Sequence, residues 1–223
     1  MTTRRDVNLG ILSTAAAAAA TMAAGESFAQ APAAIALPPP AMEGGGKSLL
    51  QALKARQSIR EYADRAVSNQ DLSNLLWAAW GVNRPEHDGR TVPRWRDAYL
   101  LDVYVIRADG VWLYDPKTHR LVFHMAGDLR GQTTSGQPFV ATAPLNLAYA
   151  VDMSKITGES EADKNATAGA TAGVSGQSVY LCCAAAGLAT VFRESVPAAL
   201  AKTLNLPQGQ VIQFAQTVGY PKA

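Results

Sequence analysis

The sequence predicts an α+β fold, carried by one folded domain that follows an N-terminal export segment. Apolar residues recur at helical spacing in some stretches and alternate or run continuously in others, without a regular βαβ alternation. The chain has 223 residues, which suits one domain with a sizeable core once the N-terminal segment is set aside. No internal repeat is visible.

The N-terminal segment, residues 1–29, has the layout of an export signal. An Arg4–Arg5 pair precedes an alanine-rich apolar run, and the small-residue sequence SFA ends at Ala29. The position of the arginine pair favours a twin-arginine signal; an ordinary secretory signal or an uncleaved anchor is the alternative. We therefore expect a periplasmic or otherwise exported protein. The twin-arginine route exports folded proteins, so it also suggests a cofactor acquired in the cytoplasm.

Residues 30–46, QAPAAIALPPPAMEGGG, are rich in proline and glycine and predict a disordered linker outside the core. The folded domain is then expected over residues 47–223. Cleavage after Ala29 would leave 223 − 29 = 194 residues with the same formal net charge of +2, because the charged residues of the signal cancel. That charge is too small to indicate binding to nucleic acid.

Helical spacing and turn residues predict the first elements of the domain. Leucines three or four residues apart indicate a first helix, and Ser68 and Gly81 are typical of the start and end of a second. The predicted elements are helices at residues 47–55 and 69–80, a polar turn-rich loop at 82–93, a hairpin at 100–115 that turns at 108–110, and a strand at 121–125.

The second half of the domain continues this mixture of helices and strands. The predicted elements are a buried strand at residues 144–151, a polar loop at 154–163, a long helix at 164–186 capped by Gly187, a strand at 188–194, a short helix at 197–203 and a final strand at 210–221. Gly169, Gly173 and Gly176 fall on one face of the long helix. Because glycine lowers helix stability, we expect something to pack very close to that face.

The cysteines and histidines predict neither a disulfide framework nor a metal site. Cys182 and Cys183 are neighbours in a predicted helix, where their side chains diverge, and they are expected to be buried apolar fillers. His87, His119 and His124 are scattered without convergent acidic or cysteine ligands. His119 is expected to be a surface or turn residue.

A cluster of hydrogen-bond donors follows the first predicted helix. Arg56, Gln57, Ser58 and Arg60 stand where side chains can converge, and arginine offers a rigid fork of donors that matches phosphate oxygens. The alternative is that the basic residues only complement the dipole of the helix C-terminus and bind nothing. The composition of this cluster does not decide between the two.

The order of short motifs along the chain resembles that of the nitroreductase family of flavoproteins, in particular its exported, stand-alone members. The resemblance covers about residues 49–222 and depends on many pieces in the right order. They are RQSIREY, LLWAAWGVNR, RTVP before DVYV, GVWLYD, FVATAPLNLAYAVD, GVSGQSVYL, AAAGLATVF and VGYPK.

The resemblance implies an α+β fold with a central, mostly antiparallel sheet flanked by helices, and a homodimer that binds FMN at the subunit interface. It implies that the R-x-S-x-R segment holds the FMN phosphate and ribityl chain, that the segment after GL gives backbone donors near the flavin ring, and that the C-terminal GYPK returns a cation toward the phosphate. The matching cofactor-binding residues are Arg56, Gln57, Ser58, Arg60, Thr190, Val191, Phe192, Arg193 and Lys222. No protein residue is assigned a catalytic role, since the flavin performs the electron chemistry.

One segment departs from the family pattern. Where the family has a small Ser–Ala pair after RT-x-P, followed by asparagine and glutamine close to the flavin ring, this chain has Arg94, Trp95, Asp97 and Tyr99. The bulkier side chains and the extra negative charge imply a displaced loop, an unusual pocket or weakened FMN binding.

Two functions therefore remain in view. The first is an FMN-dependent oxidoreductase that passes electrons from a reduced donor, NAD(P)H or a quinone or protein donor, to a nitroaromatic, a quinone or a similar small organic acceptor. The second is a cofactor-poor binding or scaffold protein of the same fold in the periplasm. The RQSIR and VGYPK segments favour the first, and the PRWRDAY segment favours the second.

Overall fold

The computed structural model describes residues 33–43, 46–194 and 196–223. The predicted export signal, residues 1–29, lies outside the described residues. The described residues form one compact unit. In the described part of the chain, no helix is both long and apolar enough to cross a membrane.

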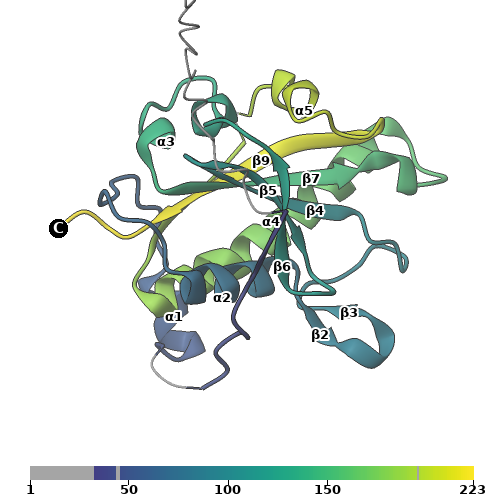
Figure 1. Cartoon of the computed structure of the whole chain (residues 1–223). Helices are drawn as coiled ribbons and strands as arrows, with labels where there is room; N and C mark the ends of the chain where they lie inside the picture. Colours follow the sequence, from purple (N-terminus) through teal and green to yellow (C-terminus); the bar gives the residue numbers. More distant parts are fainter. Residues whose placement is uncertain (1–32, 44–45, 195) are drawn as a thin grey trace, which may run out of the picture. The chain divides into compact units, whose positions relative to one another are not determined.

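A seven-stranded sheet forms the centre of this unit, and every pair of neighbouring strands is antiparallel (Figure 1). The strand order is β1-β6-β5-β4-β7-β9-β8, and a two-stranded sheet of β2 and β3 lies apart from it. The bounds are β1 Ala34–Ala36, β2 Val82–Arg84, β3 Gly89–Arg90, β4 Leu101–Arg107, β5 Gly110–Asp115, β6 Arg120–Met125, β7 Leu145–Asp152, β8 Ala189–Arg193 and β9 Gln210–Gly219. The predicted α+β fold with an antiparallel sheet is confirmed.

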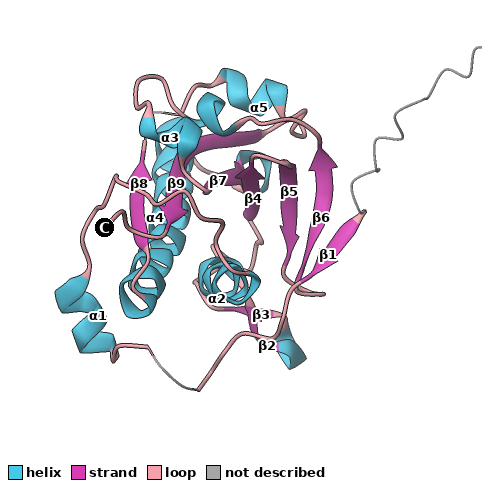
Figure 2. Cartoon of the chain, turned by 60° about the vertical axis from the view of Figure 1, so that its left-hand side comes forward, coloured by secondary structure: helices cyan, strands magenta, loops and turns pink. Residues whose placement is uncertain are grey.

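Helices cover both faces of the sheet (Figure 2). Helices α2 and α4 bury their apolar residues against one face, and α5 packs on the other. The helices are α1 Leu49–Ala55, α2 Asn69–Trp80, α3 Phe139–Thr142, α4 Glu161–Ala186 and α5 Ala199–Thr203, with 3₁₀ turns η1 Pro85–His87, η2 Arg130–Thr133 and η3 Met153–Lys155.

The central strands are buried on both faces because each face has its own apolar core. Along β4, Val103 and Val105 point toward α2 and α4, whereas Tyr104 and Ile106 point toward α5. This alternation explains why the sequence of β4 is almost continuously apolar.

Most predicted elements are confirmed, with local differences that have physical causes. Helix α4 begins at Glu161, earlier than the predicted start, because the Ser160 hydroxyl accepts a hydrogen bond from the Asp163 N–H at 3.2 Å. In α1 the residue buried against the domain is Ala52, and Leu49 and Leu50 are 64% and 76% exposed. The predicted loop at 82–93 contains the short β2–β3 pair.

The prediction that residues 30–46 lie outside the core as a disordered linker is wrong for part of that segment. Ala34–Ala36 pairs with β6 as the outermost strand of the sheet, and Leu37 belongs to the core on the α2 side. The Pro38 carbonyl then accepts a hydrogen bond from the Ser73 hydroxyl at 2.6 Å. The strand arises from pairing with the exposed edge of β6, which a proline-rich sequence does not reveal.

His119 connects the segment around Pro38 to the rest of the domain. It stands in a turn in the left-handed region, at φ 49°, as its position suggested, but its ring is half-buried. The single hydrogen of Ser73 goes to Pro38, so the Ser73 oxygen accepts from Nε2–H of His119 at 2.7 Å. Burial lowers the pKa of His119, which favours the neutral imidazole. In that form the Nδ1 atom is the acceptor for the Tyr114 hydroxyl at 2.9 Å.

The three glycines of α4 do not have equivalent surroundings. A Cβ atom at Gly176 would overlap the ring of Phe192, whereas one at Gly173 would meet nothing within 4 Å. At Gly169 the nearest side chain, Phe214, would be in ordinary contact at 3.7 Å. The predicted close approach is thus confirmed at Gly176 only, where the group that packs against it comes from the same chain.

We predict that His119→Asn weakens the acid sensitivity of folding. Asparagine tolerates the left-handed backbone but cannot replace the ring hydrogen bonds, so at pH 7.5 the variant should lose about 1–2 kcal/mol of unfolding free energy. Because the folded-state pKa is depressed below the ordinary 6.5, the wild-type advantage is present above that pH and is lost as the pH falls through the lowered pKa. Urea unfolding at several pH values measures this difference, and a difference that stays constant down to pH 5 would contradict the assignment.

We also predict opposite effects for two alanine substitutions on one helix face. Gly176→Ala should cost about 1–3 kcal/mol of unfolding free energy because the added methyl group displaces the Phe192 ring. Gly173→Ala, the matched control, should gain up to about 1 kcal/mol in the monomer from improved helix propensity. Denaturant unfolding of both variants at low protein concentration provides the test, and equal effects would show that the Phe192 contact does not require glycine.

Candidate functional site

The three segments that contain the predicted cofactor residues meet along the outer edge of strand β8. The chain leaving α1 runs beside this edge, and the Ile59 N–H donates to the Thr190 carbonyl at 3.0 Å. The C-terminal segment joins the same chain, since Lys222 N–H donates to the Glu61 carbonyl at 3.2 Å. Three segments far apart in the sequence therefore meet, as the resemblance implied.

The cations in these segments are accessible. Arg60 and Lys222 are exposed, and Arg56 is half-buried. Among the residues that the structure describes, none of the three takes part in an ion pair. Arg56 and Arg60 lie on the segment beside β8 and Lys222 lies on the segment joined to it, and an anion interacts favourably with such cations. This arrangement can bind a phosphate.

Tyr180 of α4 lies at the centre of the site, although the sequence did not single it out. Its hydroxyl is 2.7 Å from the Ser58 hydroxyl, and it accepts a hydrogen bond from the Phe192 N–H at 2.9 Å. The guanidinium of Arg56 lies 5.2 Å from the centre of the Tyr180 ring, within cation–π range. One side chain thus contacts both the segment after α1 and the edge of β8.

The side chains of β8 are mainly engaged inside the fold. The Thr190 hydroxyl donates to the Thr217 carbonyl at 2.8 Å, and Val191 is buried. The Phe192 ring stacks on Phe214, with centroids 5.0 Å apart and planes at 17°. The residues of β8 can therefore reach a ligand at the edge of the sheet through their backbone groups and through the partly exposed Phe192.

Arg193 is an internal cation whose partners are neutral. It is 4% exposed, and its guanidinium donates to the Thr133 carbonyl at 2.8 Å, to the Asn146 amide oxygen at 3.3 Å and to the Thr217 hydroxyl at 3.2 Å. Burial lowers the pKa of Arg193 to about 10. Its side chain is thus unavailable to a ligand at the edge, and a cofactor role for this residue would have to use its backbone.

The segment that departs from the family pattern folds on itself. Trp95 and Ala98 pair across a tight turn in which Arg96 and Asp97 have φ values of 42° and 63°. The guanidinium of Arg94 donates to the hydroxyl of Tyr99 at 2.8 Å and to the carboxylate of Asp97 at 2.9 Å.

This turn lies against the N-terminal half of α4. Pro93, Arg94 and Trp95 line a cavity of about 200 Å³ together with α4 residues between Thr167 and Val174. Within the described residues, no hydrogen bond or ion pair joins the turn to the segment that follows α1.

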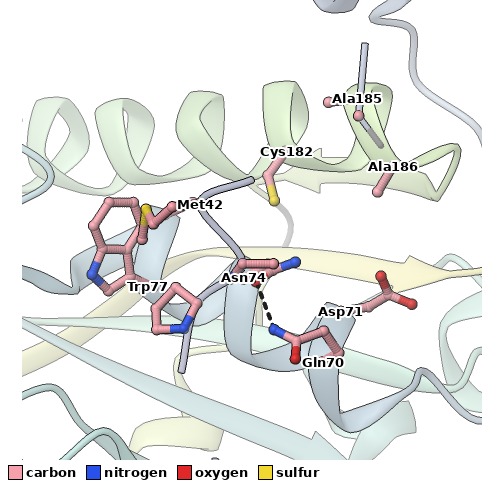
Figure 3. A pocket seen from close by; sticks show the side chains of 12 residues that line it. Met42, Gln70, Asp71, Asn74, Trp77, Cys182, Ala185 and Ala186 are labelled. Carbon is pink, nitrogen blue, oxygen red and sulfur yellow. Dashed lines mark hydrogen bonds between the residues drawn. The ribbon is translucent and has the colours of Figure 1, made fainter. Parts of the chain in front are cut away.

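A second cavity, of about 450 Å³, lies between the chain before α1, helix α2 and the C-terminal end of α4 (Figure 3). Trp77, Asn74 and Cys182 line it, and the Asn74 amide oxygen accepts from the Gln70 side chain at 3.1 Å. Burial raises the pKa of the Cys182 thiol to about 11, so the thiol is protonated and a poor nucleophile. Cys182 and Tyr180 project from different sides of α4, so the helix separates this cavity from the cation cluster.

The sequence profile of the nitroreductase family matches residues 53–220 of the chain. Together with the fold and the converging segments, this match identifies the class: the chain belongs to the nitroreductase family. The family resemblance predicted from the motifs is thereby confirmed.

Individual relatives agree with this assignment. The chain is similar to the crystal structure of a proposed nitroreductase from Ralstonia eutropha JMP134, at 34% identity and a TM-score of 0.80 over 86% of this chain and 91% of that one. It is 32% identical over 111 residues to MJ1384, a proposed nitroreductase of Methanocaldococcus jannaschii; the match spans 46% of this chain and 56% of that protein. It also shares its fold with a proposed nitroreductase from Desulfovibrio desulfuricans in complex with FMN, at 23% identity and a TM-score of 0.56 over 80% of this chain and 89% of that one.

We predict that Arg193 is a structural cation, so that Arg193→Met lowers the unfolding free energy by about 1–3 kcal/mol, because the buried acceptors lose their donors. Arg60→Met, on an exposed arginine without an ion pair in the described structure, is the matched control and should stay within about 0.5 kcal/mol of wild type. Urea unfolding compares the two variants. Equal stabilities would show that the internal hydrogen bonds of Arg193 contribute little.

Proposed function

We propose that this protein is an FMN-dependent oxidoreductase that takes electrons from a reduced donor and passes them to a nitroaromatic, a quinone or a similar small organic acceptor. Its family membership supports a flavin oxidoreductase in general. NAD(P)H is the donor expected for the family; a quinone or protein donor is the alternative for an exported protein.

One observation carries the proposal: Arg56 and Ser58 both contact Tyr180 beside β8, and their segment, which also carries Arg60, joins the segment of Lys222 along the same strand. A phosphate monoester brings close to two negative charges and several acceptor oxygens, which suits two guanidinium groups, an ammonium group and a hydroxyl. The stretch also contains Glu61 and Asp64, but neither forms an ion pair in the described structure. The charge of the cluster is therefore available to a ligand.

The remaining residues of the site would position the flavin ring. Residues 190–193 offer backbone groups along the edge of β8, and Phe192 offers the rim of an aromatic ring. Arg193 is the last residue of this strand, and its buried positive charge favours negative charge nearby. When bound, FMN supplies the electron-transfer chemistry.

The alternative, a cofactor-poor scaffold, was favoured by the unusual segment between Arg94 and Tyr99. In the structure, the negative charge of Asp97 is paired with Arg94, which also donates a hydrogen bond to Tyr99. The unusual segment is therefore a weaker argument for a scaffold than the cations near β8 are for an FMN-binding enzyme.

We further propose a homodimer, in keeping with the family expectation. Apolar side chains are exposed on α1 and α4: Leu49, Leu50, Leu53 and Val174 are 64%, 76%, 46% and 43% exposed. Gly173, on the same helix as Val174, has open space around it. A partner helix packed there would bury these groups.

The proposal predicts a yellow protein that releases FMN on denaturation and binds FMN at least tenfold more tightly than riboflavin, because riboflavin lacks the phosphate. A tenfold difference corresponds to about 1.4 kcal/mol, which one charge-assisted hydrogen bond supplies. Arg56→Ala combined with Arg60→Ala should abolish the preference, as measured by quenching of flavin fluorescence.

Lys202→Ala, which removes an exposed cation of α5 on the opposite face of the sheet, is the matched control and should leave both affinities unchanged. A colourless wild-type protein that takes up no added FMN would contradict the proposed enzymatic function and would support the role of a cofactor-poor scaffold. With flavin bound, anaerobic mixing with NADH, NADPH or a reduced quinone identifies the donor as the compound that bleaches the visible flavin absorption.

A further inference from the structure

We propose that Tyr180 is a positioning residue that orients the Ser58 hydroxyl as a hydrogen-bond donor toward the phosphate. The inference rests on the proposed function, because it concerns how the same site holds the same anion. It assigns a role to a side chain that lies outside the segments from which the family resemblance draws its site residues.

A continuous chain of hydrogen bonds carries the inference. The Phe192 N–H donates to the Tyr180 oxygen at 2.9 Å, and the Tyr180 oxygen lies 2.7 Å from the Ser58 oxygen. Ser58 is exposed, whereas Tyr180 is half-buried against the edge of β8. This series of hydrogen bonds therefore begins at the fixed backbone N–H of Phe192 and ends at the Ser58 hydroxyl, which a ligand can reach.

The direction of these bonds follows from the available hydrogens. The Phe192 amide can only donate, so the Tyr180 oxygen accepts from it. If Tyr180 then donates its own hydrogen to Ser58, the Ser58 hydrogen is left to donate to an anion. In the opposite arrangement Ser58 donates to Tyr180. The Tyr180 hydrogen then has no acceptor among the described residues, and the Ser58 lone pairs face the anion. A bound phosphate selects the first arrangement.

Two physical effects strengthen that arrangement. Each hydroxyl in a chain of donors becomes a better donor when its oxygen already accepts a hydrogen bond. The guanidinium of Arg56, 5.2 Å from the centre of the Tyr180 ring, fixes the position of that ring beside the cluster of cations. Tyr180 thus couples the strand beside the flavin ring to the segment that binds the phosphate.

Tyr180→Phe removes only the hydroxyl and tests this role through ligand discrimination. Affinity for FMN should fall roughly tenfold, the loss of one hydrogen bond to a charged group. Affinity for riboflavin, which lacks the phosphate, should change less than twofold. We call the hydrogen-bonded series from Phe192 through Tyr180 to Ser58 the relay. In the Ser58→Ala background, Tyr180→Phe should not lower the affinity for FMN further, since the hydroxyl that contacts the phosphate is already absent. Tyr104→Phe, in the core on the α5 face of the sheet, serves as the control for loss of a tyrosine hydroxyl.

The outcomes separate the two proposals. If wild-type protein does not prefer FMN over riboflavin, the proposed function and the relay are both overturned. If the wild-type preference survives Tyr180→Phe, or if this variant loses both ligands equally, the relay alone is overturned. Wild-type protein gives an independent measurement should the variant fold poorly: hydrogen exchange of the Phe192 amide should slow more with FMN than with riboflavin, and equal slowing would overturn the relay.

Discussion

The outer edge of strand β8 is the constraint on which the rest of the site depends. An edge strand presents backbone donors and acceptors that need partners, and β8 is the last strand of the sheet in the described part of the chain. The chain after α1 supplies one instead, through the Ile59 N–H to the Thr190 carbonyl, and the Tyr180 hydroxyl supplies another for Phe192. Satisfying the edge of a sheet therefore also brings the basic segment, the long helix and the C-terminus together.

The arginines of this site have two different physical roles. Arg193 is buried among neutral hydroxyl and carbonyl oxygens, so its charge is fixed inside the fold and stabilises the loop at Thr133. Arg56 and Arg60 stand at the surface without an ion pair in the described structure, which leaves their charge for a ligand. A buried cation on β8 and accessible cations beside the edge of that strand give a positive field near this edge of the sheet. That field suits both a phosphate and a reduced flavin.

Local signals in the sequence were sufficient for the elements that local physics determines. The Ser68 cap and Gly81 bound α2, and the turn before Gly110 produces the β4–β5 hairpin, as predicted. Strand β1 was missed because Ala34–Ala36 has a weak strand pattern and forms by pairing with β6, which is distant in sequence. The exposure of the α1 leucines could likewise not be predicted from the sequence, since residue spacing predicts a helix but not which of its faces is buried.

In the candidate site, too, some features could be predicted from the sequence and others depend on contacts between distant residues. Motif order placed the basic segment, β8 and the C-terminus in one site, and the structure brings them together. Tyr180 could not be predicted, because one tyrosine on a long helix of small residues has no pattern that links it to Ser58. The most direct test of the account is a crystal structure of the protein grown with FMN. The account predicts the phosphate within hydrogen-bond distance of Ser58 and Arg56, with the ring along β8; a flavin bound elsewhere, with that segment facing solvent, would contradict it.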